Sequence, residues 1–390
     1  MKVAYIDHTS DMGGAEHNLL SLVKTLSKMG VEATVLTTPG GPLIERLQAQ
    51  EIPVQLFTLS ESTKFVAREQ LGPGLLRTAF NRLPELWNVQ SQLRRRLSDL
   101  KPDIVQTNTL KAHVLGSLAV AGTGVPMIWH LQDLPTQRGN SLPLLEICAA
   151  LVKPRIACIS KAVMADLSPR LQKYASVIYN GIDSEAVRQR SKGYGQSIRT
   201  NFGIPEKAPL IGVVAHLIPW KGHRHVLAAL AQLQQKFPQL YCLCVGGEIL
   251  QFAGQKAALE AEAQRLGVAE KVFFTGQRDD VAQIMGALDF LVVPSEHEPF
   301  GLVLVEAMAL GKAIVATRSG GIPEIVCDGE TGAMVPVADS VALAEKISDY
   351  LDHPDLARRA GEAGYLRVES CFTLTTMAEK FAALYGDICD

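Results

Sequence analysis

Short β-branched runs alternate with longer amphipathic stretches along the first half of the chain. The runs predict parallel strands, and the amphipathic stretches between them, such as Ala15–Met29 and Pro84–Leu100, predict helices on both faces of a sheet. The predicted strands are Lys2–Ile6, Ala33–Thr37, Pro53–Phe57, Ile104–Thr107, Met127–His130, Arg155–Ile159 and Ser176–Tyr179.

The second half repeats this alternation and predicts a second domain. Between the halves, Asp183–Ala208 is polar, lacks apolar periodicity and is interpreted as the boundary. We therefore expect an α/β protein of two Rossmann-like, doubly wound domains, 1–183 and 184–370, with a C-terminal helix in 371–390 crossing back to the first. Such folds bind ligands at the carboxyl ends of their strands. The predicted strands of the second half are Leu210–Ala215, Tyr241–Val245, Val272–Thr275, Phe290–Pro294 and Ala313–Ala316.

Composition is consistent with two buried cores and narrows the classes of function. Of the 390 residues, 47% are hydrophobic and 20% charged, and the net charge of −2 argues against a dedicated nucleic-acid binder. The seven cysteines have no paired spacing, which predicts reduced thiols in a cytoplasmic protein. No apolar stretch is long enough to predict a membrane span.

Ser295–Ala309 has the strongest chemical pattern, because it follows a predicted strand and opens a predicted helix. Free N–H groups at a helix start form an anion site, and a glycine there lets the backbone approach the ligand. Glu306 lies among apolar residues, where a carboxylate needs donors such as ribose hydroxyls. Glu298, just before the helix, can reach a sugar hydroxyl. The alternative is an ordinary buried helix with Glu306 paired to an Arg and Glu298 solvated. The predicted anion site comprises Phe300, Gly301, Leu302 and Val303.

Lys221 and two glycines follow other predicted strands. Lys221 precedes a predicted helix, so that its ammonium can neutralise a leaving diphosphate. Gly13 and Gly14 follow the first strand, and paired glycines permit close approach of backbone amides to a phosphate or sugar. The alternative for the glycines is a tight turn without a ligand. His223 and His225 lack ligand-spaced carboxylate or Cys partners and are interpreted as solvated.

His130 and Gln132 lie at the end of a first-domain strand. Their side chains point to the same face, because strand residues alternate. Either can meet a ligand there, and the alternative is a capped strand end.

Ser295–Ala309 resembles the signature of glycosyltransferase family 4, whose members have the two-domain GT-B fold. Gly320–Gly332, Phe274–Val281 and Tyr179–Asp183 are similar, in order, to other blocks of that family. The resemblance implies a retaining transfer from a nucleotide diphosphate sugar, favouring UDP, to a hydroxyl acceptor. It places Gln277 in a nucleotide-facing loop.

The resemblance also implies roles for the remaining candidate residues. Glu298, Lys221 and His130 are the expected catalytic residues, with His130 favoured over Gln132 for contact with the transferred sugar. The Gly13–Gly14 loop covers the diphosphate. His216 occupies a position where the family usually has Arg, and histidine is mostly neutral at pH 7. It is either a phosphate contact or a structural residue.

The absence of an Asp-x-Asp motif favours a reaction with neither metal nor cofactor. We expect a role in cell-surface glycan, polysaccharide or glycolipid synthesis. Two alternatives are a nucleotide-sugar epimerase of the same fold, which would form product from the donor alone, and a nucleotide-sugar-binding pseudoenzyme.

One basic stretch, 64–101, holds eight basic and three acidic residues among apolar ones. This composition predicts a peripheral contact with the inner face of a membrane. The alternative is a solvated helix face.

Overall fold

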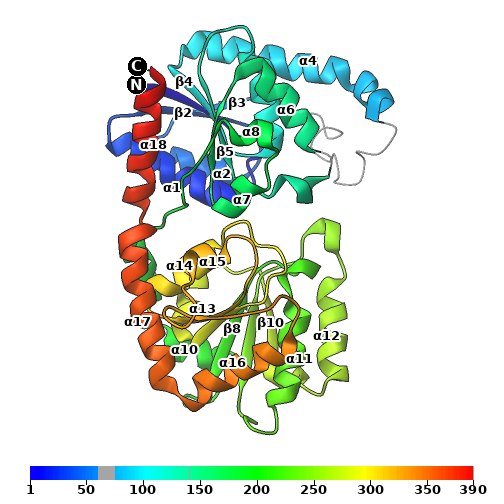
Figure 1. Cartoon of the computed structure of the whole chain (residues 1–390), viewed down its shortest axis with the longest axis vertical. Helices are drawn as coiled ribbons and strands as arrows, with labels where there is room; N and C mark the ends of the chain where they lie inside the picture. Colours follow the sequence, from blue (N-terminus) through cyan, green and yellow to red (C-terminus); the bar gives the residue numbers. More distant parts are fainter. Residues whose placement is uncertain (60–74, 140, 390) are drawn as a thin grey trace. The chain divides into compact units, whose positions relative to one another are not determined.

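The computed structural model describes residues 1–59, 75–139 and 141–389, and the chain divides into two compact units (Figure 1). Unit 1 comprises Met1–Gly181 and Leu374–Asp390, and unit 2 comprises Ile182–Thr373. The predicted domain limits, at 183 and 371, lie within three residues of these boundaries.

Unit 1 contains a seven-stranded parallel sheet in the order β3-β2-β1-β4-β5-β6-β7. All seven strands coincide with predicted ones. The doubly wound order places β1 and β4 side by side at the centre, so their carboxyl ends meet at the same edge. The strands are β1 Lys2–Ile6, β2 Glu32–Thr37, β3 Val54–Leu56, β4 Ile104–Thr107, β5 Met127–Leu131, β6 Arg155–Cys158 and β7 Ala175–Val177.

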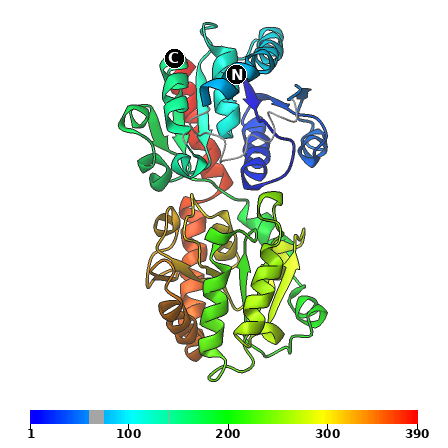
Figure 2. The ribbon, with the colours of Figure 1, turned by 90° about the vertical axis from the view of Figure 1, so that its right-hand side faces the viewer.

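Helices cover both faces of this sheet (Figures 1 and 2). α1 packs against α2 and α18 in one layer, whereas α5 packs between α4 and α6 in the other. Tyr5 and Gln106 face α18, where their side chains hydrogen-bond with Tyr385. The helices of unit 1 are α1 Gly14–Lys28, α2 Pro42–Gln48, α4 Leu75–Leu100, α5 Leu110–Val120, η1 Pro135–Arg138, α6 Ser141–Val152, α7 Lys161–Ala165, α8 Pro169–Gln172 and α18 Leu374–Cys389.

Unit 2 contains a six-stranded parallel sheet in the order β10-β9-β8-β11-β12-β13. Five of its strands were predicted. The sixth, β13, has three residues and was missed, although the equally short β3 and β7 were predicted as parts of longer runs. The strands are β8 Leu210–Val214, β9 Tyr241–Val245, β10 Val272–Gly276, β11 Phe290–Val293, β12 Ala313–Thr317 and β13 Ala333–Val335.

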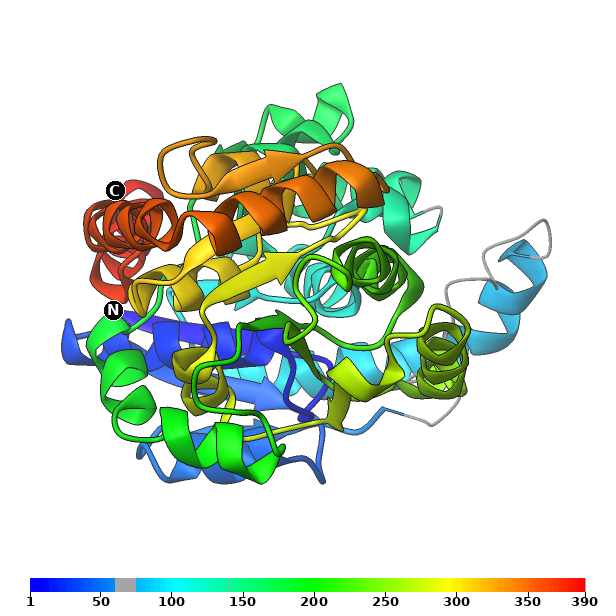
Figure 3. The ribbon, with the colours of Figure 1, turned by 90° about the horizontal axis from the view of Figure 1, so that it is seen from below.

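Helices again lie on both faces of the sheet (Figures 1 and 3). The segment 183–208, interpreted as the domain boundary, forms α9 and α10, which bury Val187 and Ile198. The helices are α9 Ser184–Ser191, α10 Gly195–Asn201, η2 Pro219–Lys221, α11 His223–Leu233, η3 Leu250–Phe252, α12 Gln255–Arg265, η4 Ala269–Lys271, α13 Val281–Ala287, α14 Leu302–Ala309, α15 Ile322–Ile325, α16 Ser340–Asp352 and α17 Pro354–Cys371.

Candidate active site

Lys221 and Glu298 form a direct ion pair at the carboxyl edge of the unit 2 sheet. Nζ of Lys221 lies 2.6 Å from Oε2 of Glu298, and the hydroxyl of Ser295 donates to the same oxygen over 3.3 Å. Glu298 is 6% exposed. The alternative interpretation, in which Glu298 is solvated, is therefore wrong, because this carboxylate is buried and paired.

Glycines make this pair possible by bringing three loops together. Gly222, at φ 73°, passes so close to β11 that a Cβ would lie 2.0 Å from the carbonyl oxygen of Pro294. Gly320, at φ 52°, approaches the backbone of Glu298 equally closely. The N–H of Gly321 donates to the carbonyl oxygen of Glu298 over 2.8 Å. Residues with a Cβ could not occupy Gly222 or Gly320 without displacing these loops.

The start of α14 has the geometry of the predicted anion site. Gly301 is its N-cap at φ 105°, and the N–H groups of Leu302 and Val303 in the first turn have no intrahelical acceptors. The side chain of Phe300 is 2% exposed, with its ring centroid 6.0 Å from that of Phe372. Phe300 can therefore contribute to a ligand site only through its backbone.

Glu306 lies one turn further along α14. Burial raises its pKa to about 7, and the nearby charge of Arg190 opposes this shift. No ion pair within 4.0 Å joins Glu306 to a cation among the described residues. A carboxyl group in this setting can accept hydrogen bonds from ligand hydroxyls.

Three neighbouring loops of unit 2 hold His216, after β8, Gly247, after β9, and Gln277, after β10. Gly247 lies between the other two residues. Nδ1 of His216 is 3.4 Å from the carbonyl oxygen of Gly247, and a Cβ on Gly247 would touch Gln277 at 3.4 Å. Both side chains are exposed. The fold thus brings these two predicted residues to one edge of unit 2.

His223 and His225 are not solvated, so that interpretation was wrong. His223 is 2% exposed, and burial lowers its pKa to about 4. Nε2 of His225 lies 3.0 Å from Oε1 of Glu296, which also accepts from Arg224. Both histidines pack at the start of α11 because Gly222 turns that helix against β11.

In unit 1, Gly13 caps α1 and Gly14 begins it. The N–H of Gly13 donates to Oε2 of Glu16 over 2.9 Å, so an internal carboxylate already satisfies this amide. Burial, reinforced by the carboxylate of Asp7, raises the pKa of Glu16 to about 7. Sequence analysis assigned no role to Glu16, although its spacing from Gly13 fits a capping box.

His130 is fully buried at the end of β5, with its ring centroid 4.8 Å from that of Phe381. Burial lowers its pKa to about 3, so the imidazole is neutral at pH 7. The amide nitrogen of Gln132 lies 3.1 Å from Nδ1 of His130, and its amide oxygen accepts from Asn180 over 3.1 Å. Gln132 is the more accessible of the two predicted candidates.

Two polar residues of this edge were missed. The strand register places Asp7, Asn108 and His130 in one row, immediately after the paired residues Ile6 and Thr107. Oδ2 of Asp7 and Nδ2 of Asn108 are buried and have no hydrogen-bond partner within the described part of the chain. A polar residue directly after each of two strands was the available signal.

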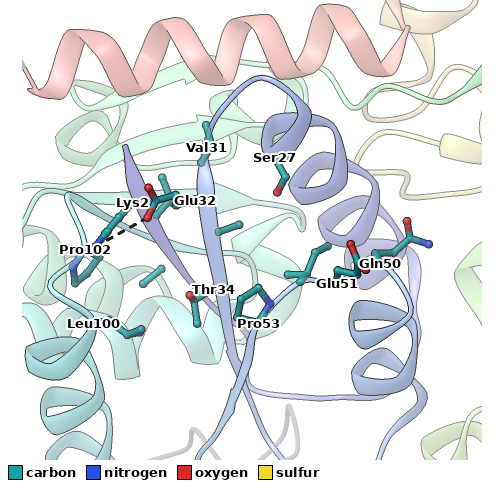
Figure 4. A pocket seen from close by; sticks show the side chains of 14 residues that line it. Lys2, Ser27, Val31, Glu32, Thr34, Gln50, Glu51, Pro53, Leu100 and Pro102 are labelled. Atoms are coloured by element: carbon teal, nitrogen blue, oxygen red, sulfur yellow. Dashed lines mark ion pairs between the residues drawn. The ribbon is translucent and has the colours of Figure 1, made fainter.

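A separate hollow of about 440 Å³ lies at the amino ends of β1 and β2 (Figure 4). Lys2 and Glu32 point toward each other at one side of it, with 4.0 Å between Nζ and Oε2. None of the predicted site residues lines it. Within the described ranges, no cluster of three or more His, Cys, Asp or Glu is placed to hold a metal ion. None of the described helices is long and apolar enough to cross a membrane.

Two family models match the chain in tandem. Residues 12–186 match "Glycosyltransferase Family 4", and residues 196–367 match "Glycosyl transferases group 1". The chain belongs to glycosyltransferase family 4. It is therefore a glycosyltransferase of the GT-B fold, as the resemblance implied.

Some curated relatives match this family 4 member over most of its length and others over about half of it. A D-inositol 3-phosphate glycosyltransferase of Streptomyces scabiei is 27% identical over 379 residues, covering 88% of this chain and 84% of the relative. An N-acetyl-alpha-D-glucosaminyl L-malate synthase of Bacillus anthracis is 28% identical over 216 residues, covering 55% and 54%.

Among known structures, Anabaena HepE in complex with UDP and glucose superposes with a TM-score of 0.84 at 26% identity, covering 99% of both chains. The complex of the same protein with UDP-glucose gives a TM-score of 0.82.

Proposed function

We propose that this chain is a retaining glycosyltransferase that uses a UDP-sugar, without metal or cofactor, to glycosylate a hydroxyl acceptor. The likeness to HepE carries the proposal, because that protein covers 99% of this chain and binds UDP and UDP-glucose. The proposed role is in cell-surface glycan, polysaccharide or glycolipid synthesis, at the cytoplasmic side of a membrane.

Lys221 and the α14 start would stabilise the leaving diphosphate. The Lys221 ammonium, 2.6 Å from Glu298, can hold a phosphate oxygen and this carboxylate at once, since an ammonium has three donors. The N–H groups of Leu302 and Val303 add positive potential at the helix start. Charge developing on the diphosphate would then meet preorganised donors, which is the main source of such catalysis.

Glu298 would accept hydrogen bonds from hydroxyls of the transferred sugar, and Glu306 from those of the ribose. No enzyme nucleophile is needed if the acceptor attacks on the face from which UDP leaves, with a phosphate oxygen taking its proton. Gln132, the more accessible of the two, would contact the sugar through hydrogen bonds, and neutral His130, 3.1 Å from its amide nitrogen, would orient it.

We further propose a peripheral membrane contact through 64–101. Residues 64–74 of this stretch lie outside the described residues. Within its described part, Trp87 on α4 is 72% exposed. An exposed Trp on a basic helix is typical of an interfacial anchor.

Metal-free donor binding is the first expected result. UDP should bind with the same affinity, measured by calorimetry, in buffer with Mg²⁺ and in buffer with a chelator. GDP in parallel tests the base preference. Binding that disappears with the chelator would refute metal independence, whereas tighter binding of GDP would refute only the choice of UDP.

Acceptor screening should include D-inositol 3-phosphate alongside lipid-linked sugars, because the former is in the name of a relative.

Glu306→Ala should weaken UDP binding by about 2 kcal/mol, because ribose hydroxyls would lose a charged or strongly accepting partner. Glu306→Gln keeps an acceptor and should lose less. Calorimetry with UDP and thermal unfolding of both variants separate the two roles. Normal UDP binding by a Glu306→Ala protein that unfolds easily would assign the residue to stability alone.

His216→Arg should raise UDP affinity about tenfold. Arginine carries a fixed charge and two parallel donors for phosphate, which an imidazole cannot match. Calorimetry of the wild type and the variant with the same UDP preparation measures the difference. Equal affinities would contradict a phosphate contact at this position.

A further inference from the structure

One helix of unit 1 exposes an apolar face. On α6, Leu144, Ile147 and Leu151 are 43%, 60% and 55% exposed. Their spacing of three and four residues puts them on one side of the helix. The buried residues of the same helix, including Leu145, Cys148 and Ala149, cover a different side.

The composition of α6 is unusual for a helix with an exposed side. Glu146 is its one charged residue among twelve. A surface helix normally carries charged and polar residues on its outer face, and a helix that is apolar all round is normally buried. The exposed side of α6 therefore has the composition of a contact surface rather than of a solvated one.

Basic side chains lie beside this helix and directly after its C-terminal end. Nη1 of Arg170 lies 3.3 Å from Oε2 of Glu146, which places α8 beside α6. Lys153 directly follows α6, and Arg155 and Lys173 are also exposed nearby in the chain. One other acidic residue occurs between 141 and 176, Asp166, and its carboxylate accepts two hydrogen bonds from Thr136. The surroundings of the apolar face are thus positively charged.

We propose that the exposed face of α6 docks on an anionic lipid surface, with Leu144, Ile147 and Leu151 inserted among the acyl chains. The basic groups of Lys153 and Arg170 would contact lipid phosphates. A membrane fits better than a protein, because the face offers aliphatic side chains without directional hydrogen-bonding groups. Three such residues are also far fewer than the roughly 20–30 that each side of a stable protein interface supplies.

This inference extends the membrane contact proposed for 64–101. It adds exposed aliphatic side chains, which the described part of that stretch lacks. α5 packs between α4 and α6, so the three helices form one layer of unit 1 (Figure 1). The described part of α4 contributes one exposed aromatic residue, Trp87, whereas α6 contributes three aliphatic ones. Trp87→Gln tests the α4 contact alone, so the two contacts can fail separately.

The experiment is co-sedimentation of the full chain with phosphatidylcholine vesicles, with and without 30% phosphatidylglycerol. The wild type should bind the anionic vesicles, and salt should weaken binding. Because burial of each aliphatic side chain is worth roughly a tenfold change in partition, the triple variant Leu144→Gln/Ile147→Gln/Leu151→Gln should lose at least tenfold. Lys153→Gln/Arg170→Gln should lose the preference for anionic vesicles.

Leu366→Gln is the matched control, since Leu366 is 67% exposed on α17, in unit 2, and should not affect partition. UDP calorimetry on the triple variant should match the wild type, which shows that it is folded and separates this test from that of donor binding. A wild type that ignores anionic vesicles, or a triple variant that binds them equally, overturns the proposal. So does self-association of the wild type that the triple variant abolishes, which would assign the face to a second copy.

Discussion

Gly320→Ala is expected to destabilise the protein by about 3 kcal/mol and to weaken UDP binding at least tenfold. A Cβ on Gly320 would lie 2.0 Å from the carbonyl oxygen of Glu298, and the residue has φ 52°. The left-handed conformation costs an L-residue about 1–2 kcal/mol, and forced displacement of packed atoms adds about 1–3 kcal/mol. Denaturant unfolding and UDP calorimetry measure the two effects.

Gly329→Ala is the matched control for backbone strain. Gly329 has φ 78°, but a Cβ there would meet nothing within 4 Å. This variant should therefore lose only about 1 kcal/mol of stability and keep its affinity for UDP. Equal losses in the two variants would mean that strain alone matters, and that the close approach to Glu298 does not position the donor site.

The sheets could be predicted from the sequence because each long strand is an apolar run bounded by polar residues. All predicted strands formed, from Lys2–Ile6 to Ala313–Ala316, with small differences at their ends. The errors fall on short elements. β13 has three residues, and α9 and α10 are polar helices that bury single side chains, Val187 and Ile198. Tertiary contacts rather than a local period determine such elements.

The strand-end positions of Lys221 and Glu298 were readable from the sequence, but their contact was not. The two residues are 77 positions apart, and their ion pair depends on the close approaches of Gly222 to Pro294 and of Gly320 to Glu298. A glycine in a sequence shows only that a turn is permitted. Which backbone it approaches is decided by the assembled sheet.

The ionisation of Glu16 was equally beyond local reasoning. Its place three residues after Gly13 predicts a cap at the start of α1. Its raised pKa arises because the assembled sheet buries it next to Asp7, from another element. A carboxylate that caps the glycine loop therefore ionises near neutral pH.

Glu16→Gln is expected to stabilise the protein by about 3 kcal/mol at pH 8 and by almost nothing at pH 4. Below its ordinary pKa of 4.5, Glu16 is protonated in both the folded and unfolded chain. As pH rises from 4.5 through about 7, the unfolded chain releases this proton first, so the wild type loses stability. The loss is then constant, and a pKa difference of this size corresponds to about 3 kcal/mol.

Glutamine retains an oxygen that can accept from the N–H of Gly13, so the variant keeps the cap while removing the charge. Denaturant unfolding from pH 4 to pH 8 measures the difference between wild type and variant. Glu45→Gln, which removes an exposed first-turn carboxylate of α2, supplies the baseline. A difference that does not grow between pH 4.5 and 7 would show that Glu16 ionises normally, and that Asp7 and burial do not hold its proton.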